Sequence, residues 1–348
     1  MPAVAASSTT KVLVSGANGY IAVWVVRKLL EKGFAVRGTV RSDAKGAFLK
    51  EAFKSYGDKF ELVIVPDITK DGAFDEAVKG VDAIEHTASP FHFNAKDPQE
   101  LIEPAVKGTV GILASALKNG SAVKRIVVTS SVAAIVHNDP NPIVLDENDW
   151  NEQSPKEVEE LGENATNTAK YRASKTLAEK AAWDFWNTHK SEVKWDLVCI
   201  NPPFVLGPTI HEVSNAAALN TSARQFYDAI VKPDNGGTNL DSAGCWIDVR
   251  VLGDAHVAAL EAESAGGERI IVNAGAFYWQ QWLDVANALE PSPIPSHTLS
   301  KGTPGSWKGK TYPVVYKTAK EERILGLKKT TMEILARDTL ADFEAKGW

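Results

Sequence analysis

The chain contains little cysteine: only Cys199 and Cys245 occur among its 348 residues. Two cysteines that far apart fit no metal-binding spacing, and they form no disulfide framework of the kind found in small secreted proteins. The seven histidines are scattered along the sequence. We therefore expect no metal site, and we expect a protein of the reducing cytoplasm.

Long apolar runs and long basic runs are also missing. No stretch reaches the roughly 18 consecutive apolar residues of a membrane-spanning helix. The formal net charge is −6, and the sequence has no tract rich in lysine or arginine. Nothing in it therefore indicates a basic surface that would bind a nucleic acid. The first residues, MPAVAASSTTK, lack the charged head and long apolar run of a secretory signal. We expect neither a membrane nor a nucleic-acid partner.

What the sequence does contain is an alternation of short β-rich runs with helical stretches. Hydrophobic residues make up 44% of the chain, which is enough for a large core and two domains. We expect strands at 11–16, 35–40, 61–65, 82–88, 124–131 and 195–201, and helices at 20–32, 44–55, 72–79, 98–119 and 168–189. Apolar strands separated by helices predict an α/β fold of the Rossmann type, a doubly wound parallel sheet with helices on both faces.

The regular alternation stops after Pro202 and Pro203. A strand-like run follows at 269–275, and helical stretches follow at 279–289 and 330–346. We predict a Rossmann domain over residues 1–201 and a smaller, mostly helical, substrate-binding part over 202–348. A segment near 240–270 is expected to return to the Rossmann domain. The active cleft should lie where the two parts meet, at the carboxyl ends of the strands.

The first strand leads into the turn GANGYIA, with Gly16, Gly19 and Ala22 at the spacing G-x-x-G-x-x-A. Glycine is needed there because a side chain would block a pyrophosphate. The helix that follows offers free N–H groups and the positive end of its dipole. Taken alone, the pattern also fits a plain turn in which Ala22 packs. Its place between the first strand and the first helix favours a dinucleotide site.

The end of the second strand distinguishes NAD from NADP. An acidic residue would bind the ribose diol of NAD, whereas an arginine accommodates the 2′-phosphate of NADP. Here Arg41 ends the strand and Lys45 lies four residues on, so two cations match a dianionic phosphate. The alternative is a solvated basic turn, because Asp43 lies between the two cations. We predict NADP, used as NADPH.

The residues that end the next two strands are also candidates for contact with a cofactor. Asp67 and Ile68 close the third strand and would meet the adenine edge, and Thr87 and Ser89 close the fourth. Each of these also fits an ordinary cap at a strand end. Only the neighbouring glycine turn favours contact with a cofactor.

The stretch YRASK places Tyr171 and Lys175 four residues apart, on one face of a predicted helix. Such a pair is common on helix surfaces. Here it lies downstream of a dinucleotide turn, and Ser130 and Ser131 end the preceding strand near the expected nicotinamide. Carbonyl reduction needs a proton besides the hydride of NADPH. Tyr171 would donate the proton, Lys175 would lower the pKa of the phenol and bond the nicotinamide ribose, and Ser131 would orient the carbonyl oxygen.

These motifs resemble the extended short-chain dehydrogenase/reductase family, in which a glycine turn, a serine and Tyr-x-x-x-Lys follow in this order. Within that family the chain is similar to the fungal methylglyoxal/isovaleraldehyde reductases, the yeast aldehyde reductases and the plant dihydroflavonol reductases. The matching stretches run from residue 14 to about 250: VSGANGYIA, VPDITK, HTASPFHF, VVTSS, ASKTLAEKAAWDF, NPPFVLGP, LNTS and WIDVR. HTASPF and NPPFVLGP are more specific than the motifs of the wider superfamily.

The resemblance implies a site residue by residue. It places the catalytic trio at Ser131, Tyr171 and Lys175, with Ser130 as a supporting neighbour. It implies cofactor contacts at Gly16, Ala17, Asn18, Gly19, Tyr20, Ile21, Arg41, Lys45, Asp67, Ile68, Thr87, Tyr171, Lys175, Pro202, Val205 and Ser222. It also implies a substrate pocket lined by Phe91, Val132, Thr168 and Phe204, each of which fits a core position equally well.

The sequence departs from the family pattern in two motifs. Ala22 replaces the third glycine of the wider superfamily. The usual IDVRD-V-A-x-AH stretch reads IDVRVLGDAH, so that Gly253 is introduced and the second acid is displaced to Asp254. This second departure bears on helix packing rather than on the chemistry. In addition, Val132 stands where relatives can carry an aromatic residue, which indicates a different substrate shape.

Three functions are compatible with these motifs. The first is an NADPH-dependent carbonyl reductase, which reduces aldehydes or ketones to alcohols. The second is a nucleotide-sugar epimerase or dehydratase, but such enzymes carry further acid–base residues after the serine pair, and VAAIV at 132–136 offers none. The third is a non-catalytic NADP-binding redox sensor, a class that tends to lose the Tyr/Lys pair. We predict the reductase, acting on a small-molecule carbonyl substrate as a monomer or homodimer.

Overall fold

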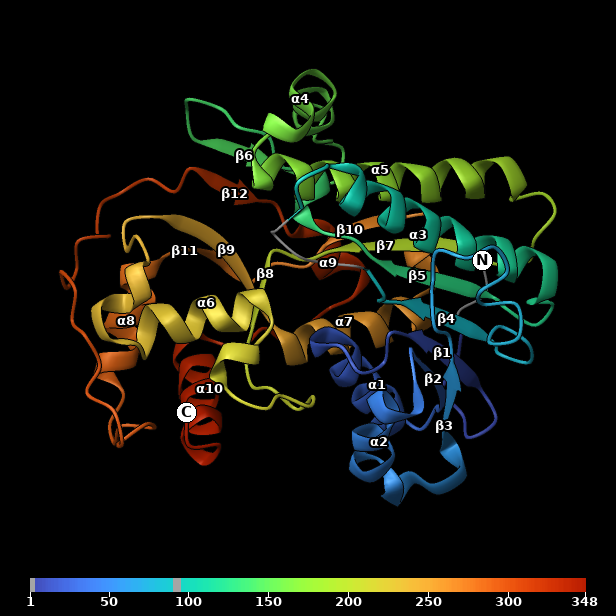
Figure 1. Cartoon of the computed structure of the whole chain (residues 1–348), viewed down its shortest axis with the longest axis horizontal. Coiled ribbons are helices and arrows are strands. Elements are labelled where there is room, and N and C mark those ends of the chain that lie inside the picture. The colour runs from blue at the N-terminus through green and yellow to red at the C-terminus, as the bar shows by residue number, and fades with distance from the viewer. Residues whose placement is uncertain (1–3, 90–94) are drawn as a thin grey trace.

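A seven-stranded parallel sheet forms the centre of the molecule (Figure 1). The structure is a computed structural model, and it describes residues 4–89 and 95–348. The strands are β1 (Lys11–Ser15), β2 (Ala35–Val40), β3 (Phe60–Ile64), β4 (Ala83–His86), β5 (Arg125–Thr129), β7 (Asp196–Asn201) and β10 (Arg269–Ile271). They lie in the order β10-β7-β5-β4-β1-β2-β3, and every neighbouring pair is parallel. The predicted Rossmann-type sheet is confirmed.

The direction of strand addition reverses between β1 and β4, because β2 and β3 lie on one side of β1 and the later strands lie on the other. In open α/β sheets, ligands bind beyond the carboxyl ends of the strands at such a point. The register pairs Ser15 with His86, so the loops that follow the two strands start side by side. The Ser15 hydroxyl joins them, since it hydrogen-bonds His86 Nδ1 (2.9 Å) and accepts from the Thr87 N–H (3.0 Å).

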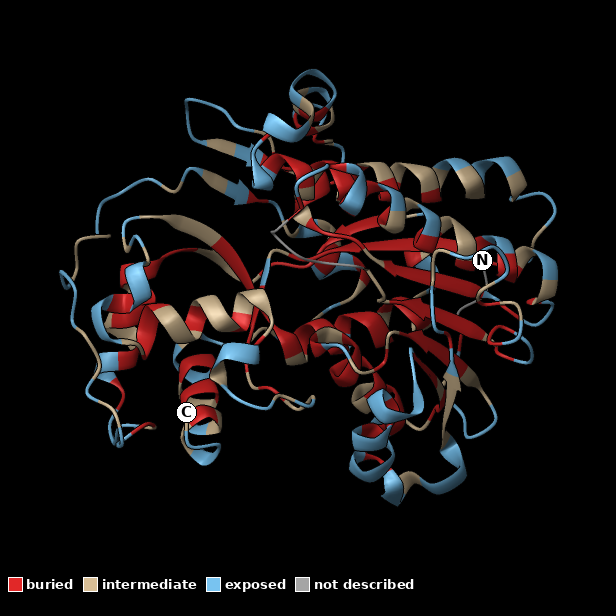
Figure 2. Cartoon of the chain, in the orientation of Figure 1, coloured by how far each residue is buried: buried red, intermediate tan, exposed pale blue. Residues whose placement is uncertain are grey.

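Helices cover both faces of the sheet (Figure 1). On one face, α1 (Tyr20–Lys32) packs against α7 (Val249–Glu261). On the other face, α3 (Gln99–Asn119) packs against α5 (Asn167–His189). Helix α2 (Asp43–Ala52) lies beside β3. Successive side chains of β1 serve the two faces, as the period of a strand requires: Val12 and Val14 join the core under α1, and Leu13 joins the core under α3. The inner strands are therefore buried from both sides, whereas the edge strand β3 is only partly buried (Figure 2).

The helix predicted at 72–79 is wrong, because residues 71–80 form turns. Phe74 and Val78 are buried at helical spacing, and one helical hydrogen bond joins them, from the Val78 N–H to the Phe74 carbonyl oxygen (3.0 Å). Gly72 and Gly80, however, adopt φ values of 70° and 69°, the left-handed conformation in which helices end. The stretch between these glycines is too short for a helix to propagate beyond one turn.

The C-terminal part is mostly helical and has a core of its own. Helices α6 (Thr221–Ile230), α8 (Trp279–Ala288) and α10 (Met332–Ala345) pack with a three-stranded sheet of β8 (Phe204–Leu206), β9 (Ala243–Asp248) and β11 (Gly275–Tyr278). Aromatic rings fill this core: Trp282 lies edge-on against Trp246 and Phe226, with ring centres 5.0 Å and 5.5 Å apart.

The remaining elements are a two-stranded sheet of β6 (Ile143–Leu145) and β12 (Val314–Tyr316), and helices α4 (Gln153–Leu161) and α9 (Ala319–Ile324). None of the helices in the described part of the chain is long and apolar enough to span a membrane.

The strand-like run predicted at 269–275 divides between the two larger sheets. Residues 269–271 form β10, which pairs with β7 at the edge of the parallel sheet. Gly275 begins β11, which pairs antiparallel with β9. Helix α7, which precedes β10, packs on α1, and β10 pairs with β7, so both elements join the first 201 residues. Strand β10 also contacts α9.

The departure at IDVRVLGDAH leaves α7 unbroken. Asp248 caps the helix by accepting a hydrogen bond from the Arg250 N–H (2.8 Å). Gly253 faces α1, where a Cβ would lie 3.0 Å from Lys28 Cγ and 3.4 Å from the Trp24 carbonyl oxygen. The glycine therefore lets the two helices approach closely, and Asp254 adds an ion pair with Lys28 (3.0 Å).

Candidate active site

A cavity of about 580 Å³ lies between the carboxyl ends of the parallel strands and the C-terminal part. Its walls come from the loops after β1, β4, β5 and β7, from α5 and the start of α6, and from β9 and β12. The predicted site residues that line it are Gly16, Gly19, Tyr20, Ile21, Thr87, Ser131, Val132, Thr168, Tyr171, Lys175, Pro202, Phe204, Val205 and Ser222. Residues from all three predicted groups, catalytic, cofactor-binding and substrate-binding, thus meet at one place.

The other predicted cofactor residues do not line this cavity: Ala17, Asn18, Arg41, Lys45, Asp67 and Ile68. Ala17 is fully buried, and its N–H donates to the Thr39 carbonyl oxygen (2.9 Å). Ile68 packs on α3, where its Cδ1 lies 2.9 Å from the point that a Cβ on Gly108 would occupy. The predicted substrate residue Phe91 lies outside the described residues.

The glycine turn has the geometry of a close-approach loop. Gly16 adopts a φ of +64°, and a Cβ there would lie 3.1 Å from the Ala88 Cβ, so the position is both conformationally and sterically suited to glycine. Gly19 is the N-cap of α1, and no side chain caps the helix. The amino end of α1 therefore presents N–H groups and a positive dipole end beside the cavity, as an anion-binding loop requires.

The basic pair after β2 lies at the same edge of the sheet. The side chains of Arg41 and Lys45 are exposed, and neither forms an ion pair with any residue in 4–89 or 95–348. Asp43, the acid between them, pairs instead with Lys50 (3.6 Å). Both cations are therefore available at the end of β2, which suits a phosphate site and a solvated turn alike.

Asp67 behaves as a cap of its own loop. Its Oδ1 accepts hydrogen bonds from the Thr69 hydroxyl (2.6 Å) and from the Thr69 N–H (2.9 Å). These bonds, with a weaker contribution from Lys70, lower the pKa of the carboxyl. The local cap that the sequence left open as an alternative is therefore formed.

The three predicted catalytic side chains converge from two elements. Ser131 follows β5, and its hydroxyl accepts from the Ala133 N–H (3.1 Å). Tyr171 and Lys175 lie on α5. The Ser131 hydroxyl hydrogen-bonds the Tyr171 phenol, and Lys175 Nζ donates to the Ser89 hydroxyl beyond β4 (3.1 Å). A hydroxyl, a phenol and an ammonium therefore share one wall of the cavity.

Burial shifts the pKa of two of these groups. It raises the pKa of Tyr171 above its usual value, and the hydrogen bond with Ser131 offsets part of that rise. It lowers the pKa of Lys175 to about 8, although the negative charge of Glu179 acts in the opposite direction and raises that pKa. The direction at Tyr171 is the opposite of the sequence expectation, because desolvation of the phenol dominates. Near neutral pH the phenol holds its proton and most Lys175 side chains are charged.

A buried carboxylate, Glu179, ties the serine pair to the helix that carries Tyr171. It accepts hydrogen bonds from the Ser130 hydroxyl (2.5 Å) and from Asn201 Nδ2 (2.8 Å). Asn201 Nδ2 also donates to the Ser131 carbonyl oxygen (3.1 Å). The ends of β5 and β7 are thereby held against α5, and this fixes where Ser131 lies relative to Tyr171.

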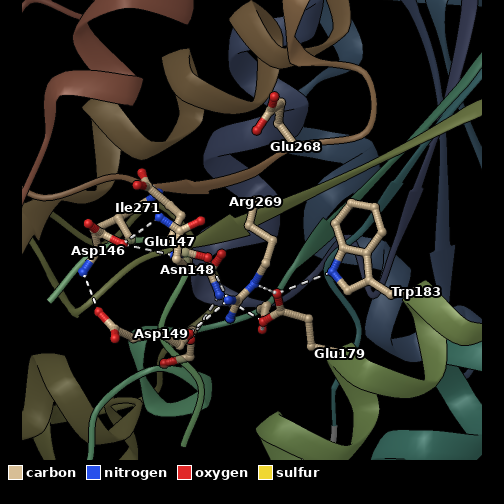
Figure 3. A network of polar contacts seen from close by, with 12 residues as sticks. Asp146, Glu147, Asn148, Asp149, Glu179, Trp183, Glu268, Arg269 and Ile271 are labelled. Carbon is tan, nitrogen blue, oxygen red and sulfur yellow. Dashed lines mark hydrogen bonds and ion pairs between the residues drawn. The ribbon is translucent and has the colours of Figure 1, made fainter.

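Arg269 balances the Glu179 charge (Figure 3). Its Nε donates to Glu179 (2.5 Å), and its Nη1 donates to the carbonyl oxygens of Glu147 and Asp149 (both 2.8 Å). The guanidinium also lies 3.5 Å from the centre of the Trp150 ring. A buried ion pair of this kind is costly to break, because either partner alone would be an unpaired buried charge. The ion pair with Arg269 therefore anchors the Glu179 side chain behind the serine loop.

Further side chains that the sequence did not indicate also line the cavity, among them Arg172, Gln225, Cys245 and Tyr316. Arg172 is the residue after Tyr171, and its place within YRASK was the one signal that could have found it. The other three come from α6, β9 and β12, which meet α5 only in the folded chain. Burial raises the pKa of Cys245 to about 12, so it stays a thiol. The described residues contain no group of His, Cys, Asp and Glu side chains that could hold a metal ion.

Comparison with known proteins gives one family and a consistent set of relatives. The model of the NAD dependent epimerase/dehydratase family matches residues 12–275. The ketoreductase azaE of Aspergillus niger is 40% identical over 291 residues, which cover 82% of this chain and 84% of that protein. A putative NADPH-dependent methylglyoxal reductase of Candida albicans, GRP2, is 42% identical over 317 residues, covering 87% and 89%. The crystal structure of yeast methylglyoxal/isovaleraldehyde reductase Gre2 complexed with NADPH matches with a TM-score of 0.87 at 33% identity, covering 97% of this chain and 99% of that one.

Proposed function

Since the chain belongs to the NAD dependent epimerase/dehydratase family, we propose that it is an NADPH-dependent carbonyl reductase, an oxidoreductase that reduces an aldehyde or ketone to an alcohol. The relatives named as ketoreductase and methylglyoxal reductases support this class. The observation that carries the proposal is the single cavity in which Ser131, Tyr171 and Lys175 meet the glycine turn. We further propose a cytoplasmic enzyme, monomeric or homodimeric, with a small carbonyl substrate.

The residues around one half of the cavity suit NADPH. Gly16 permits the close approach of a pyrophosphate, and the uncapped end of α1 supplies N–H donors. Arg41 and Lys45 would hold the 2′-phosphate with two positive charges. The predicted contacts farther along the cavity are Thr87, Pro202, Val205 and Ser222. When bound, the cofactor supplies the hydride.

The chain's own residues would handle the proton. Tyr171, whose phenol is protonated at neutral pH, donates its proton to the carbonyl oxygen as negative charge develops there. The Ser131 hydroxyl shares a hydrogen bond with the phenol and would orient the same oxygen. The Lys175 ammonium, one turn along α5, favours the phenolate that remains and also reaches toward the cofactor ribose. Glu179 and Asn201 hold the loop that carries Ser131.

A nucleotide-sugar epimerase or dehydratase on the same scaffold is the alternative function, and a non-catalytic NADP-binding redox sensor is the third. The segment after the serine pair favours the reductase, since Val132, Ala133 and Val136 bring apolar side chains to the cavity wall. Such a wall suits an aldehyde or ketone better than a sugar diphosphate. The sensor would give Tyr171 and Lys175 no task.

The decisive experiment is NADPH oxidation against a panel of carbonyl compounds. The panel contains methylglyoxal, 3-methylbutanal, ethyl acetoacetate, an aryl ketone and a dihydroflavonol, with NADH in place of NADPH as the control. We expect turnover with NADPH on at least one compound and much weaker turnover with NADH. Tight NADPH binding without turnover on any compound would contradict the reductase and favour the two alternatives.

The choice between the two nicotinamide cofactors is expected to depend on Arg41. Arg41→Ala should raise KM for NADPH by about 10- to 100-fold, the effect expected when charge-assisted hydrogen bonds to a phosphate are lost. KM for NADH should change far less, because NADH lacks the 2′-phosphate. Steady-state kinetics with both cofactors measure the two values on one preparation. Equal effects on both cofactors would remove Arg41 from the phosphate site.

A further inference from the structure

We propose that the cavity accepts carbonyl substrates that carry a carboxylate, and that Arg172 binds this group. The inference rests on the proposed carbonyl reductase function and names its substrate class. It starts from the charges on the cavity wall. Among the described residues that line the cavity, two carry a charge, Lys175 and Arg172, and both are cations. No aspartate or glutamate in the described ranges lines it.

The two cations differ in what already engages them. Lys175 belongs to the proposed chemistry, and its Nζ donates to Ser89 (3.1 Å). Arg172 takes no part in that chemistry. Its Nη1 donates to the side-chain oxygen of Asn138 (3.0 Å), which is a neutral acceptor. The wall therefore presents one guanidinium that the transfer of hydride and proton does not use.

Arg172 also has no carboxylate within ion-pair distance among the described residues. It is half-buried, and it forms no ion pair with any residue in 4–89 or 95–348. Burial lowers the pKa of its guanidinium from the usual value, and the charges of Tyr316 and Glu157 offset only part of that shift. Glu157 lies beyond ion-pair distance and accepts hydrogen bonds from Thr166 instead, so the cation has lost water without full compensation. By contrast, three enclosed arginines each pair with a carboxylate: Arg125 with Asp196, Arg269 with Glu179 and Arg250 with Asp248. The half-buried Arg337 lies outside the cavity and donates to the backbone carbonyl oxygens of Glu290 and Pro291. An anionic ligand would supply the missing partner.

The surroundings of Arg172 indicate where that anion would lie. Tyr316 of β12 lines the same cavity and interacts electrostatically with Arg172. Burial raises the pKa of its phenol, so it remains a neutral O–H donor. Val136 and Val314 add apolar surface to the same wall. If Arg172 and Tyr316 bound the carboxylate of a substrate, the carbon chain between that carboxylate and the carbonyl would lie along this apolar surface.

The position of Arg172 next to Tyr171 limits the distance between the carboxylate and the reacting carbonyl of the substrate. Arg172 directly follows Tyr171 on α5, so the bound anion and the reacting carbonyl would lie within one small molecule's length of each other. The cavity measures about 580 Å³ and would also hold the nicotinamide end of the cofactor, so the space left suits a small compound. The class that meets these conditions is a short oxo acid, with its ketone or aldehyde a few carbons from the carboxylate.

The test compares oxo acids with their own esters. With NADPH as cofactor, kcat/KM is measured for 3-oxobutanoate, 4-oxopentanoate and 5-oxohexanoate and for the methyl ester of each. The ester keeps the carbonyl and the spacer but removes the charge. In the wild type we expect at least one acid to be preferred over its ester. In Arg172→Met that acid-to-ester ratio should fall by about 10- to 100-fold, as for the loss of a charge-assisted hydrogen bond.

Two control variants make the result specific. Arg172→Lys keeps the charge but loses the planar fork, so it should retain part of the preference. Arg27→Met removes a positive charge from the exposed side of α1, where Arg27 pairs with Glu31 (3.4 Å), and it should leave the ratio unchanged. Because each ratio compares two substrates on one preparation, a partial loss of folded enzyme cancels.

Each other outcome overturns the inference in a recognisable way. An acid-to-ester ratio that is equal in the wild type and Arg172→Met at all three chain lengths refutes it, as does an equal fall in Arg27→Met. In both cases the esters are still reduced, and the proposed reductase stands. If neither acids nor esters are reduced although NADPH binds, the reductase itself fails and the inference fails with it.

Discussion

Replacing Tyr171 by phenylalanine is expected to lower kcat by about 10²- to 10⁴-fold, the usual contribution of a positioned general acid. The substitution removes only the hydroxyl, so the ring keeps its place on α5 while the proton donor and the hydrogen bond to Ser131 are lost. Affinity for NADPH should change little, because the proposed phosphate contacts lie on other elements. Steady-state NADPH oxidation measures kcat, and fluorescence titration measures cofactor binding.

A matched control is Tyr227→Phe. Tyr227 lies on α6, and its ring packs against Phe343 (5.4 Å) rather than against the predicted catalytic residues. This variant should turn over like the wild type. A Tyr171→Phe enzyme with unimpaired turnover would exclude the phenol as proton donor and would require another acid in the cavity.

Replacing Lys175 by methionine is expected to weaken NADPH binding and to lower kcat by about 10²- to 10³-fold, as for the loss of a group that stabilises developing charge. The same side chain predicts a pH dependence. Burial lowers its pKa to about 8, so the ammonium is present below that pH and is lost above it. The wild-type rate at saturating NADPH should therefore fall as the pH rises through about 8. In Lys175→Met this fall should be absent.

The measurement is kcat as a function of pH for the wild type, Lys175→Met and a surface control. Lys118→Met is a suitable control, because Lys118 is exposed on α3 and pairs with Asp75 (2.9 Å). The control should keep the wild-type profile. If the decline near pH 8 persisted in Lys175→Met, it would belong to another group, and the proposed role of Lys175 beside Tyr171 would be refuted.

The sequence was sufficient for most of the parallel sheet, because apolar β-rich runs between helices leave few other arrangements. It failed where the outcome depended on single conformations or on distant partners. The helix predicted at 72–79 does not form, since Gly72 and Gly80 enclose it in left-handed conformations. The run at 269–275 reads as one strand, yet β7 and β9 each take one end of it, and strand pairing of that kind has no local signal.

The sequence by itself determined the parts of the candidate site whose geometry is local. The positive φ of Gly16 and the helical spacing of Tyr171 and Lys175 depend on a few neighbouring residues, so their motifs can be recognised in the linear chain. Only the tertiary structure decided what surrounds them. Glu179 meets Ser130, Asn201 and Arg269 through the order of β5, β7 and β10, and Tyr316 reaches the cavity from β12. The reason is physical: hydrogen bonds and desolvation between distant segments depend on strand order and packing, which residue periodicity does not encode.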